Sequence, residues 1–373
     1  MALNTILING AEVGDKFLGN RGAEHLLRTC AARLRGMGLQ PAVTFGKVDP
    51  SLIAELGLAQ YVGNPRIDKA DKYLPKVRTG KLVSIKGLSG VLDASGFALG
   101  DAWGVETAKW LQRKYRQWDS QGIPVIALPQ AYGAFTDPAL ASMCREALSI
   151  CRLVFPRDST SAEHLRSLGL GSQVSEHVPD ITIGEDLRSG KFPRLRRMVV
   201  VPNWNLAERG DKGAYVASLI EGVRWARRHQ LDVVGLLHEG QRDLQLLQHL
   251  QSEEPLRIVA DLTGWETKRF IAESEIVISG RYHAVLAALT TNTPVLTHSW
   301  SHKYREVLSQ FGVDDWLAEP DDPNSVSEKL DLVVESAKSS DLEHRRQVLV
   351  SSIEAMWSQV RDVIGPAAKG SAL

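Results

Sequence analysis

Cysteine is scarce in this chain of 373 residues, which has three, Cys30, Cys144 and Cys151. An odd number without metal-ligand spacing argues against a disulfide framework or a zinc site. All three fall in segments that we expect to be helical. The sequence therefore predicts buried, reduced thiols.

Long apolar runs are also missing. No stretch reaches the roughly 18 residues that a transmembrane helix needs. Residues 1–10 lack both a basic n-region and a long apolar core, so we expect them to form a first strand rather than a signal peptide.

Net charge is absent too, because 44 Lys and Arg balance 44 Asp and Glu. A general nucleic-acid or membrane-surface binder usually shows a basic excess, so we expect no nucleic-acid partner. The hydrophobic fraction of 43% is that of an ordinary globular protein. The length is comfortable for two domains.

Strand-like and helix-like segments alternate from end to end, and a polar stretch at 184–193 interrupts the pattern. This order predicts an α/β protein with two Rossmann-like, doubly wound domains, 1–185 and 186–373, facing each other across a cleft. The expected strands are 4–9, 41–45, 90–94, 123–128, 153–155, 197–201, 231–238, 257–259, 275–279 and 294–297. The expected helices are 23–35, 105–120, 138–150, 241–251, 282–289 and the segment from about 325.

The strongest candidate site follows the buried strand 275–279. Arg281 and His283 come where that strand gives way to a helix, and ligands of open α/β sheets collect at this edge. A guanidinium, an imidazole and a helix N-terminus suit an anion and a proton. After the next strand, Lys303 begins a helix, where a cation is unfavourable unless it faces an anion. His298 and His302 compete with His283 as the proton donor.

Two glycine-containing loops could approach a ligand with their backbone. The first holds Asn20, Arg21, Gly22 and Glu24 before the first long helix, although Glu24 could simply favour the helix dipole. The second follows the strand 90–94 and contains Gly96, where a plain strand-to-loop turn is the alternative.

Polar residues follow the next two strands of the same half. Gln130 follows the apolar strand 123–128 and could hydrogen-bond a polyol. Arg157 follows the strand 153–155, where Asp158 could orient it and Ser161 is one of three residues that could cap the next helix. Such an oriented arginine suits a carboxylate or a phosphate. The alternative is a capped helix with an exposed ion pair.

The metal and nucleophile motifs of other enzyme classes are missing. No histidine pair has the HExxH context and no cysteine pair the CxxC context of a metal site, and no GxSxG nucleophile elbow occurs. We expect no metal in catalysis.

The elements above occur in an order that resembles the polysaccharide pyruvyl transferases. The matching runs are 19–24 (GNRGAE), 128–133 (LPQAYG), 157–161 (RDSTS), 178–180 (VPD), 278–284 (ISGRYHA), and 293–295 (TPV) with Lys303. The Arg-x-His run with the downstream Pro and Lys is the most specific of these. The resemblance covers nearly the whole chain.

The resemblance implies a fold similar to the two-domain GT-B glycosyltransferases. It implies transfer of the enolpyruvyl unit of phosphoenolpyruvate onto two hydroxyls of a sugar, which leaves a cyclic ketal. Arg157 and Arg281 would hold the phosphate and carboxylate of the donor, and His283 would be the acid. The remaining substrate-binding positions would be Asn20, Arg21, Gly22, Glu24, Gly96, Gln130, Asp158, Ser161 and Lys303.

The same resemblance implies no cofactor, because phosphoenolpyruvate is the donor substrate. The acceptor would be a sugar, a lipid-linked sugar or a polysaccharide. We expect a cytoplasmic protein, one that reaches the inner face of the membrane through its acceptor, and a homo-oligomer is compatible with the sequence.

Two other functions stay open. A nucleotide-sugar glycosyltransferase on the same scaffold would need a ribose site, for which Glu239 and Asp243 are candidates. A catalytically silent glycan-binding homologue is the other alternative, because fold does not fix function. The transferase hypothesis requires Arg157, Arg281 and His283 to meet at one pocket.

Overall fold

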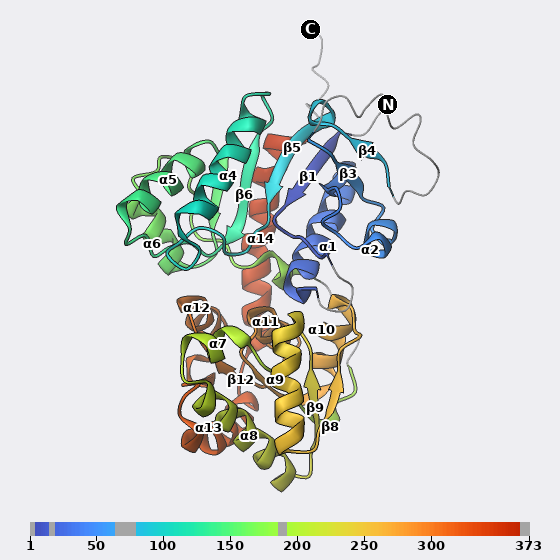
Figure 1. The fold of residues 1–373 in the computed structure, drawn as a ribbon, viewed down its shortest axis with the longest axis vertical. Helices are drawn as coiled ribbons and strands as arrows, with labels where there is room; N and C mark the ends of the chain where they lie inside the picture. Colours follow the sequence, from blue (N-terminus) through green and yellow to red (C-terminus); the bar gives the residue numbers. More distant parts are fainter. Residues whose placement is uncertain (1–3, 15–18, 64–79, 186–191, 366–373) are drawn as a thin grey trace. The chain divides into compact units, whose positions relative to one another are not determined.

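The computed structural model describes residues 4–14, 19–63, 80–185 and 192–365. Strands and helices alternate in it, and the strands form two sheets in which every neighbouring pair is parallel (Figure 1). This confirms the expected α/β class with two doubly wound units. Within the described residues, no helix combines the length and apolarity needed to cross a membrane.

The first sheet has seven strands in the order β4-β3-β2-β1-β5-β6-β7. All six residues of β6 (Val125–Gln130) are buried, as a parallel strand covered on both faces should be. The other strands are β1 (Thr5–Asn9), β2 (Gln40–Thr44), β3 (Ala59–Tyr61), β4 (Leu82–Val83), β5 (Leu88–Asp93) and β7 (Leu153–Pro156). The helices between them are α1 (Arg21–Gly36), α2 (Pro50–Glu55), α4 (Gly104–Asp119), α5 (Pro138–Ser149) and α6 (Ser159–Ser167).

The second sheet has six strands in the order β10-β9-β8-β11-β12-β13. These are β8 (Leu195–Val201), β9 (Asp232–Leu236), β10 (Arg257–Val259), β11 (Ser274–Ser279), β12 (Val295–His298) and β13 (Leu317–Ala318). Its helices are α7 (Trp204–Arg209), α8 (Lys212–Arg228), α9 (Gly240–Glu253), α10 (Gly264–Ala272), α11 (Tyr282–Thr290), α12 (His302–Phe311) and α13 (Val326–Ala337).

The chain divides into two compact units, and the division differs from the predicted one in two segments. One unit comprises Met1–Gly14, Leu26–Thr182 and Ser351–Leu373, and the other comprises Asp15–His25 and Ile183–Val350. The final helix α14 (Leu342–Ile364) therefore ends in the first unit, where Ile364 packs on Gly90 of β5. A Cβ at Gly90 would lie 2.9 Å from Ile364 Cγ2, so a larger residue here would push Ile364 away from the strand.

The long periodic elements expected from the sequence are present within a few residues of their predicted ends. The short elements α2, β3 and β4 were not predicted, because six residues or fewer carry little periodicity, and the longer helices α8 and α10 were missed as well. The three cysteines are free and buried, but Cys151 lies just after α5 rather than inside a helix. Most of the proposed linker, at 186–191, lies outside the described residues.

Candidate functional site

The turn between β11 and α11 is held by backbone contacts that fix the position of Arg281. Ser279 Oγ accepts a hydrogen bond from Arg281 N at 3.0 Å. The carbonyl of Gly280 accepts bonds from Asn203 Nδ2 and from Tyr304 Oη, at 2.6 and 2.7 Å. A Cβ at Gly280 would lie 2.5 Å from Leu206 Cδ1, so a side chain here would force Leu206 to move. These contacts thus fix the position of Arg281 at the start of α11.

Two carboxylates hold the guanidinium of Arg281. Nε and Nη2 donate to the two oxygens of Asp243 at 2.7 and 2.6 Å, and Nη1 donates to Glu239. Burial would by itself lower the pKa of Arg281, but Asp243 and Glu239 outweigh it and raise that pKa overall. Arg281 is therefore a permanently charged and firmly oriented group. Its charge is already balanced, which the sequence did not indicate.

His283 packs against the first turn of α1. A Cβ placed on Gly22 would lie 2.2 Å from His283 Nδ1, so the ring rests directly on the glycine backbone. The ring of Tyr282 meets that of His283 edge to face, with centroids 5.2 Å apart, and Tyr282 is buried. The structure therefore brings together two of the sequence-predicted positions, Gly22 and His283.

The other predicted residues of that first turn make structural contacts. Asn20 Oδ1 accepts from Ala23 N at 3.1 Å, which caps α1. Buried Glu24 accepts from the backbone N of Gly264, at the start of α10, at 2.8 Å. Arg21 is buried beside Glu24, at 3.4 Å, and its backbone N donates to the carbonyl of His238. These contacts fix the position of the turn beneath His283.

His238 is a candidate that the sequence analysis missed. It follows β9 and is 3% exposed, and among the described residues neither of its ring nitrogens has a hydrogen-bond partner. Burial lowers its pKa far below the ordinary value, and the neighbouring charges of Arg281 and His283 lower it further. The imidazole is therefore neutral. The sequence could have indicated His238 by its position just past a strand, because residues past the carboxyl ends of parallel strands lie at the same edge of the sheet.

The residues around β12 have different environments. Lys303 lies in the first turn of α12, with Nζ 4.8 Å from the ring centre of Trp300 and 5.5 Å from that of Tyr282. His298 ends β12 in full burial, which lowers its pKa to about 4. A histidine that is neutral at pH 7 has no proton to give as a general acid. His298 is therefore a weaker candidate for the proton donor than His283. His302 is the first residue of α12.

The predicted residues of the first unit also cluster at the carboxyl edge of their sheet. Arg157 is 2% exposed, and its Nη1 donates to buried Asp180 at 3.0 Å. Its backbone N donates to the carbonyl of Gln130, at the end of β6. Ser161 Oγ accepts from Tyr132 N at 2.9 Å. Three separate stretches of the sequence therefore meet here.

The cap of α6 differs from the three residues proposed for it. Asp158 is the capping residue, and its side chain accepts from Ser161 N at 2.7 Å. Asp158 precedes all three of the proposed residues, Ser159, Thr160 and Ser161, and its carboxylate satisfies a free N–H group of the first turn. Gly96 lies in the left-handed region at φ +72°, and its carbonyl accepts from Ala131 N. This bond ties the loop after β5 to the one after β6.

Metal ligands are not grouped anywhere in the described ranges. No set of three or more His, Cys, Asp or Glu side chains there is arranged to hold an ion.

Known proteins similar to the chain fall into two groups. The family model described as "Polysaccharide pyruvyl transferase" matches residues 20–302. None of the curated proteins compared with the chain matches it significantly.

Solved structures share the fold at low sequence identity. UDP-GlcNAc 2-epimerase from Neisseria meningitidis, bound to UDP-GlcNAc, has a TM-score of 0.58 and 12% identity, covering 97% of this chain and 100% of its own. The structure of S. aureus MnaA with UDP has a TM-score of 0.60 and 13% sequence identity, and the match covers 96% of each chain. The spinosyn rhamnosyltransferase SpnG has a TM-score of 0.50 and 12% sequence identity, and the match covers 97% of this chain and 99% of SpnG. These similarities show a GT-B-like fold.

Proposed function

The chain belongs to the polysaccharide pyruvyl transferase family, and we propose that it transfers the enolpyruvyl group of phosphoenolpyruvate onto two hydroxyls of a sugar. The product is a cyclic pyruvate ketal on a polysaccharide or a glycan precursor. The observation that carries the proposal is the pairing of an oriented guanidinium, Arg281, with an imidazole, His283, at the start of α11.

The reaction needs a proton at a carbon atom. His283 donates its proton to the methylene carbon of phosphoenolpyruvate, which becomes a methyl group. The positive charge then develops at the adjacent carbon, where the first sugar hydroxyl adds. The phosphate leaves with its bridging oxygen, and the second hydroxyl closes the ring at the same carbon. Of the two hydroxyl protons released, one restores His283 and the other leaves on the phosphate. General acid catalysis of this kind contributes about 10²- to 10⁴-fold in rate.

The geometry around His283 suits this role. The ring is half-buried and rests on Gly22, so it has a fixed position with respect to the first turn of α1 and to α11. The N-terminus of α11 lies beside it, and Arg281 caps that helix without a side-chain hydrogen bond to the cap. The partial positive charge of a helix N-terminus favours an anion. A donor phosphate placed there would favour the protonated imidazole.

Asp243 and Glu239 occupy three of the five N–H groups of Arg281, so a donor anion can bind the remaining N–H groups or displace one carboxylate. Asp243 is fully buried and makes two bonds, whereas the side chain of Glu239 is 34% exposed and makes one. We assign Glu239 as the exchangeable partner, since its solvation cost on release is the smaller. A donor carboxylate or phosphate would then take Nη1. Arg157, oriented by Asp180, is the second proposed anion-binding group.

The nucleotide-sugar alternative has less support in the described residues. It would place the ribose hydroxyls on Glu239 and Asp243, and both carboxylates instead bind Arg281. A ribose at Asp243 would leave the guanidinium without its buried partner, which is costly.

The decisive experiment offers phosphoenolpyruvate together with a panel of sugar acceptors, and measures phosphate release and the mass of a pyruvate ketal. We expect both for the wild type with at least one acceptor. We expect neither for His283→Ala, while phosphoenolpyruvate still binds that variant. The proposal is wrong if His283→Ala keeps near-normal turnover, or if UDP- or GDP-sugars are turned over and phosphoenolpyruvate is not.

A further inference from the structure

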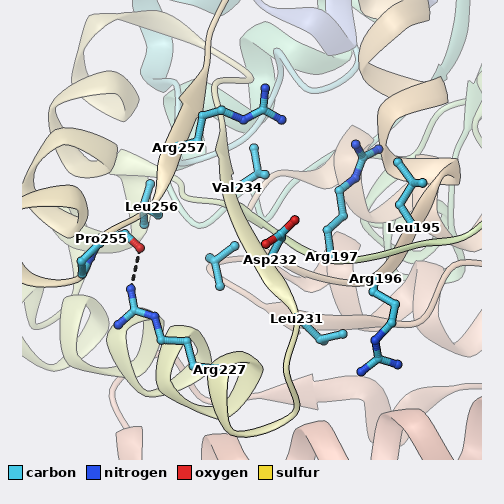
Figure 2. Close-up of a pocket in the computed structure, with 11 residues that line it drawn as sticks. Leu195, Arg196, Arg197, Arg227, Leu231, Asp232, Val234, Pro255, Leu256 and Arg257 are labelled. Atoms are coloured by element: carbon cyan, nitrogen blue, oxygen red, sulfur yellow. Dashed lines mark hydrogen bonds between the residues drawn. The ribbon is translucent and has the colours of Figure 1, made fainter.

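A pocket lies at the opposite edge of the second sheet from Arg281. It has a volume of about 820 Å³. Its walls come from the amino ends of β8, β9 and β10, from the last turn of α8 and from the segment before β10 (Figure 2). Arg281 and His283 follow the carboxyl end of β11, which is parallel to β8. The pocket therefore takes no part in the candidate site above.

The charged residues of this pocket share one face of the sheet. Arg197 of β8 is opposite Asp232 of β9, and Val234 of β9 is opposite Arg257 of β10. Since side chains alternate along a strand, Asp232 and Val234 point to the same face, and their partners point there too. Figure 2 shows the side chains of Arg197, Asp232 and Arg257 around a common space.

Three of the four arginines at the pocket already have acidic partners. Arg227 pairs with Glu254, Arg196 lies 3.7 Å from Glu275, and Arg197 lies 3.7 Å from Glu273. These pairs orient the guanidiniums but reduce their net charge.

Arg257 and Asp232 are different. Within the described part of the chain, neither side chain makes an ion pair or a hydrogen bond. Burial lowers the pKa of Arg197, Glu273 raises it, and the charge of Arg257 lowers it again, so the two guanidiniums lie close enough to repel. The pocket thus presents two neighbouring guanidiniums, Arg197 and Arg257, next to the carboxylate of Asp232. Among the described residues, Arg257 has no acidic partner and Asp232 has no hydrogen-bond donor.

We propose that this pocket binds a sugar unit that carries a carboxylate or a phosphate. Arg257 donates to the anion, assisted by Nη1 of Arg197, whose Nε and Nη2 already donate to Ser274 Oγ and to the carbonyl of Phe270. Asp232 accepts from the sugar hydroxyls. The apolar side chains of Leu195, Val234 and Leu256 line the same space and offer contact to the C–H face of a pyranose.

Other small ligands use only part of this arrangement. A bare anion would satisfy the arginines but would be repelled by Asp232 and would leave the apolar wall unused. A neutral sugar would leave Arg257 without a partner. An acidic sugar satisfies all three kinds of group. The proposal does not depend on the transferase chemistry, because it concerns binding at a separate edge of the sheet.

The test is ligand binding by the full chain, measured by ligand-observed NMR or calorimetry. The four probes are glucuronic acid, glucose 6-phosphate, glucose and inorganic phosphate. We expect the wild type to bind one or both acidic sugars more tightly than glucose or phosphate. The preferred acidic sugar distinguishes a carboxylate ligand from a phosphate ligand. Arg257→Ala should weaken that binding about tenfold or more, because a charge-assisted bond is lost.

Two further variants make the test specific. Asp232→Asn should weaken binding of the acidic sugar, because the carboxylate that accepts from its hydroxyls is lost. The same change should strengthen binding of inorganic phosphate, because the repulsion between Asp232 and the phosphate is removed. Arg305→Ala, an exposed arginine of α12 paired with Glu319, is the matched control and should change nothing. Turnover of phosphoenolpyruvate should be unaffected by Arg257→Ala, which separates this proposal from the proposed function. Equal binding of the acidic sugar by wild type and Arg257→Ala, or no preference for it over phosphate, would overturn the proposal.

Discussion

Arg281 and Asp243 form a two-point ion pair, with Nε–Oδ2 at 2.7 Å and Nη2–Oδ1 at 2.6 Å, and Asp243 is completely buried. Asp243 also accepts from the backbone N of Trp204 at 2.9 Å. A single carboxylate thus connects the start of α7, the first turn of α9 and the residue that precedes α11. The position of His283 depends on this connection, since His283 follows Arg281 by two residues.

Asp243→Asn should therefore destabilise the protein strongly. The amide cannot neutralise the guanidinium, which keeps only the partly exposed Glu239, and breaking a buried ion pair costs about 3 kcal/mol. Chemical denaturation measures the change in the free energy of unfolding. The matched control is Glu239→Gln, which removes the more exposed partner and should cost less than about 1 kcal/mol. If the two variants lose equal stability, the buried pair does not have the structural role described here.

Gly22→Ala should impair catalysis without unfolding the chain. The new Cβ would lie 2.2 Å from His283 Nδ1, so the ring must move. We expect kcat to fall by at least about tenfold, because a small misplacement of an acid is costly, while the melting temperature changes little. Gly36→Ala is the control in the same helix, because nothing lies within 4 Å of a Cβ there. Equal activity of both variants would show that the position of His283 is not critical.

Arg157→Lys should raise KM for phosphoenolpyruvate more than it lowers kcat. Lysine keeps the charge but loses the planar fork that Asp180 orients, so binding to the donor should weaken about tenfold. Steady-state kinetics with varied phosphoenolpyruvate measure both constants. Arg166→Lys, at an exposed position of α6, should behave as the wild type. An unchanged KM in Arg157→Lys would remove Arg157 from the donor site.

The parts that the sequence could predict are those set by local pattern. Continuous apolar runs identified strands such as β6, and a strand followed by a helix located Arg281 and His283. The partners of these residues could not be predicted, because contacts such as Arg281 with Asp243 join segments 38 residues apart. Gly22 and His283, which are in contact, lie even farther apart along the sequence.

The missed candidate illustrates the same limit. His238 lies just past β9 on the edge that carries the site, yet nothing local in the sequence distinguishes it from a buried structural histidine. Its lack of a hydrogen-bond partner among the described residues is visible only in three dimensions. The pocket at the amino ends of β8, β9 and β10 was also unpredictable, because the register of these three neighbouring strands brings together residues that lie far apart along the chain.

His298 makes the stability of the protein depend on pH in a defined direction. Burial lowers its pKa from an ordinary 6.5 to about 4, so between these values the unfolded chain binds a proton that the folded chain does not. The stabilisation is complete above pH 6.5, falls as the pH drops toward 4, and is lost below it. The difference corresponds to about 3 kcal/mol.

The variant that tests this is His298→Gln, which cannot take up the proton. Its stability at pH 7 should be lower, because the edge contact with Tyr215 is disturbed. Its loss of stability between pH 6.5 and 4 should nevertheless be smaller than that of the wild type by about 3 kcal/mol, measured by urea denaturation at each pH. His249→Gln, at an exposed position of α9, should retain the pH dependence of the wild type. Parallel pH profiles for wild type and His298→Gln would show that His298 does not titrate as its burial requires.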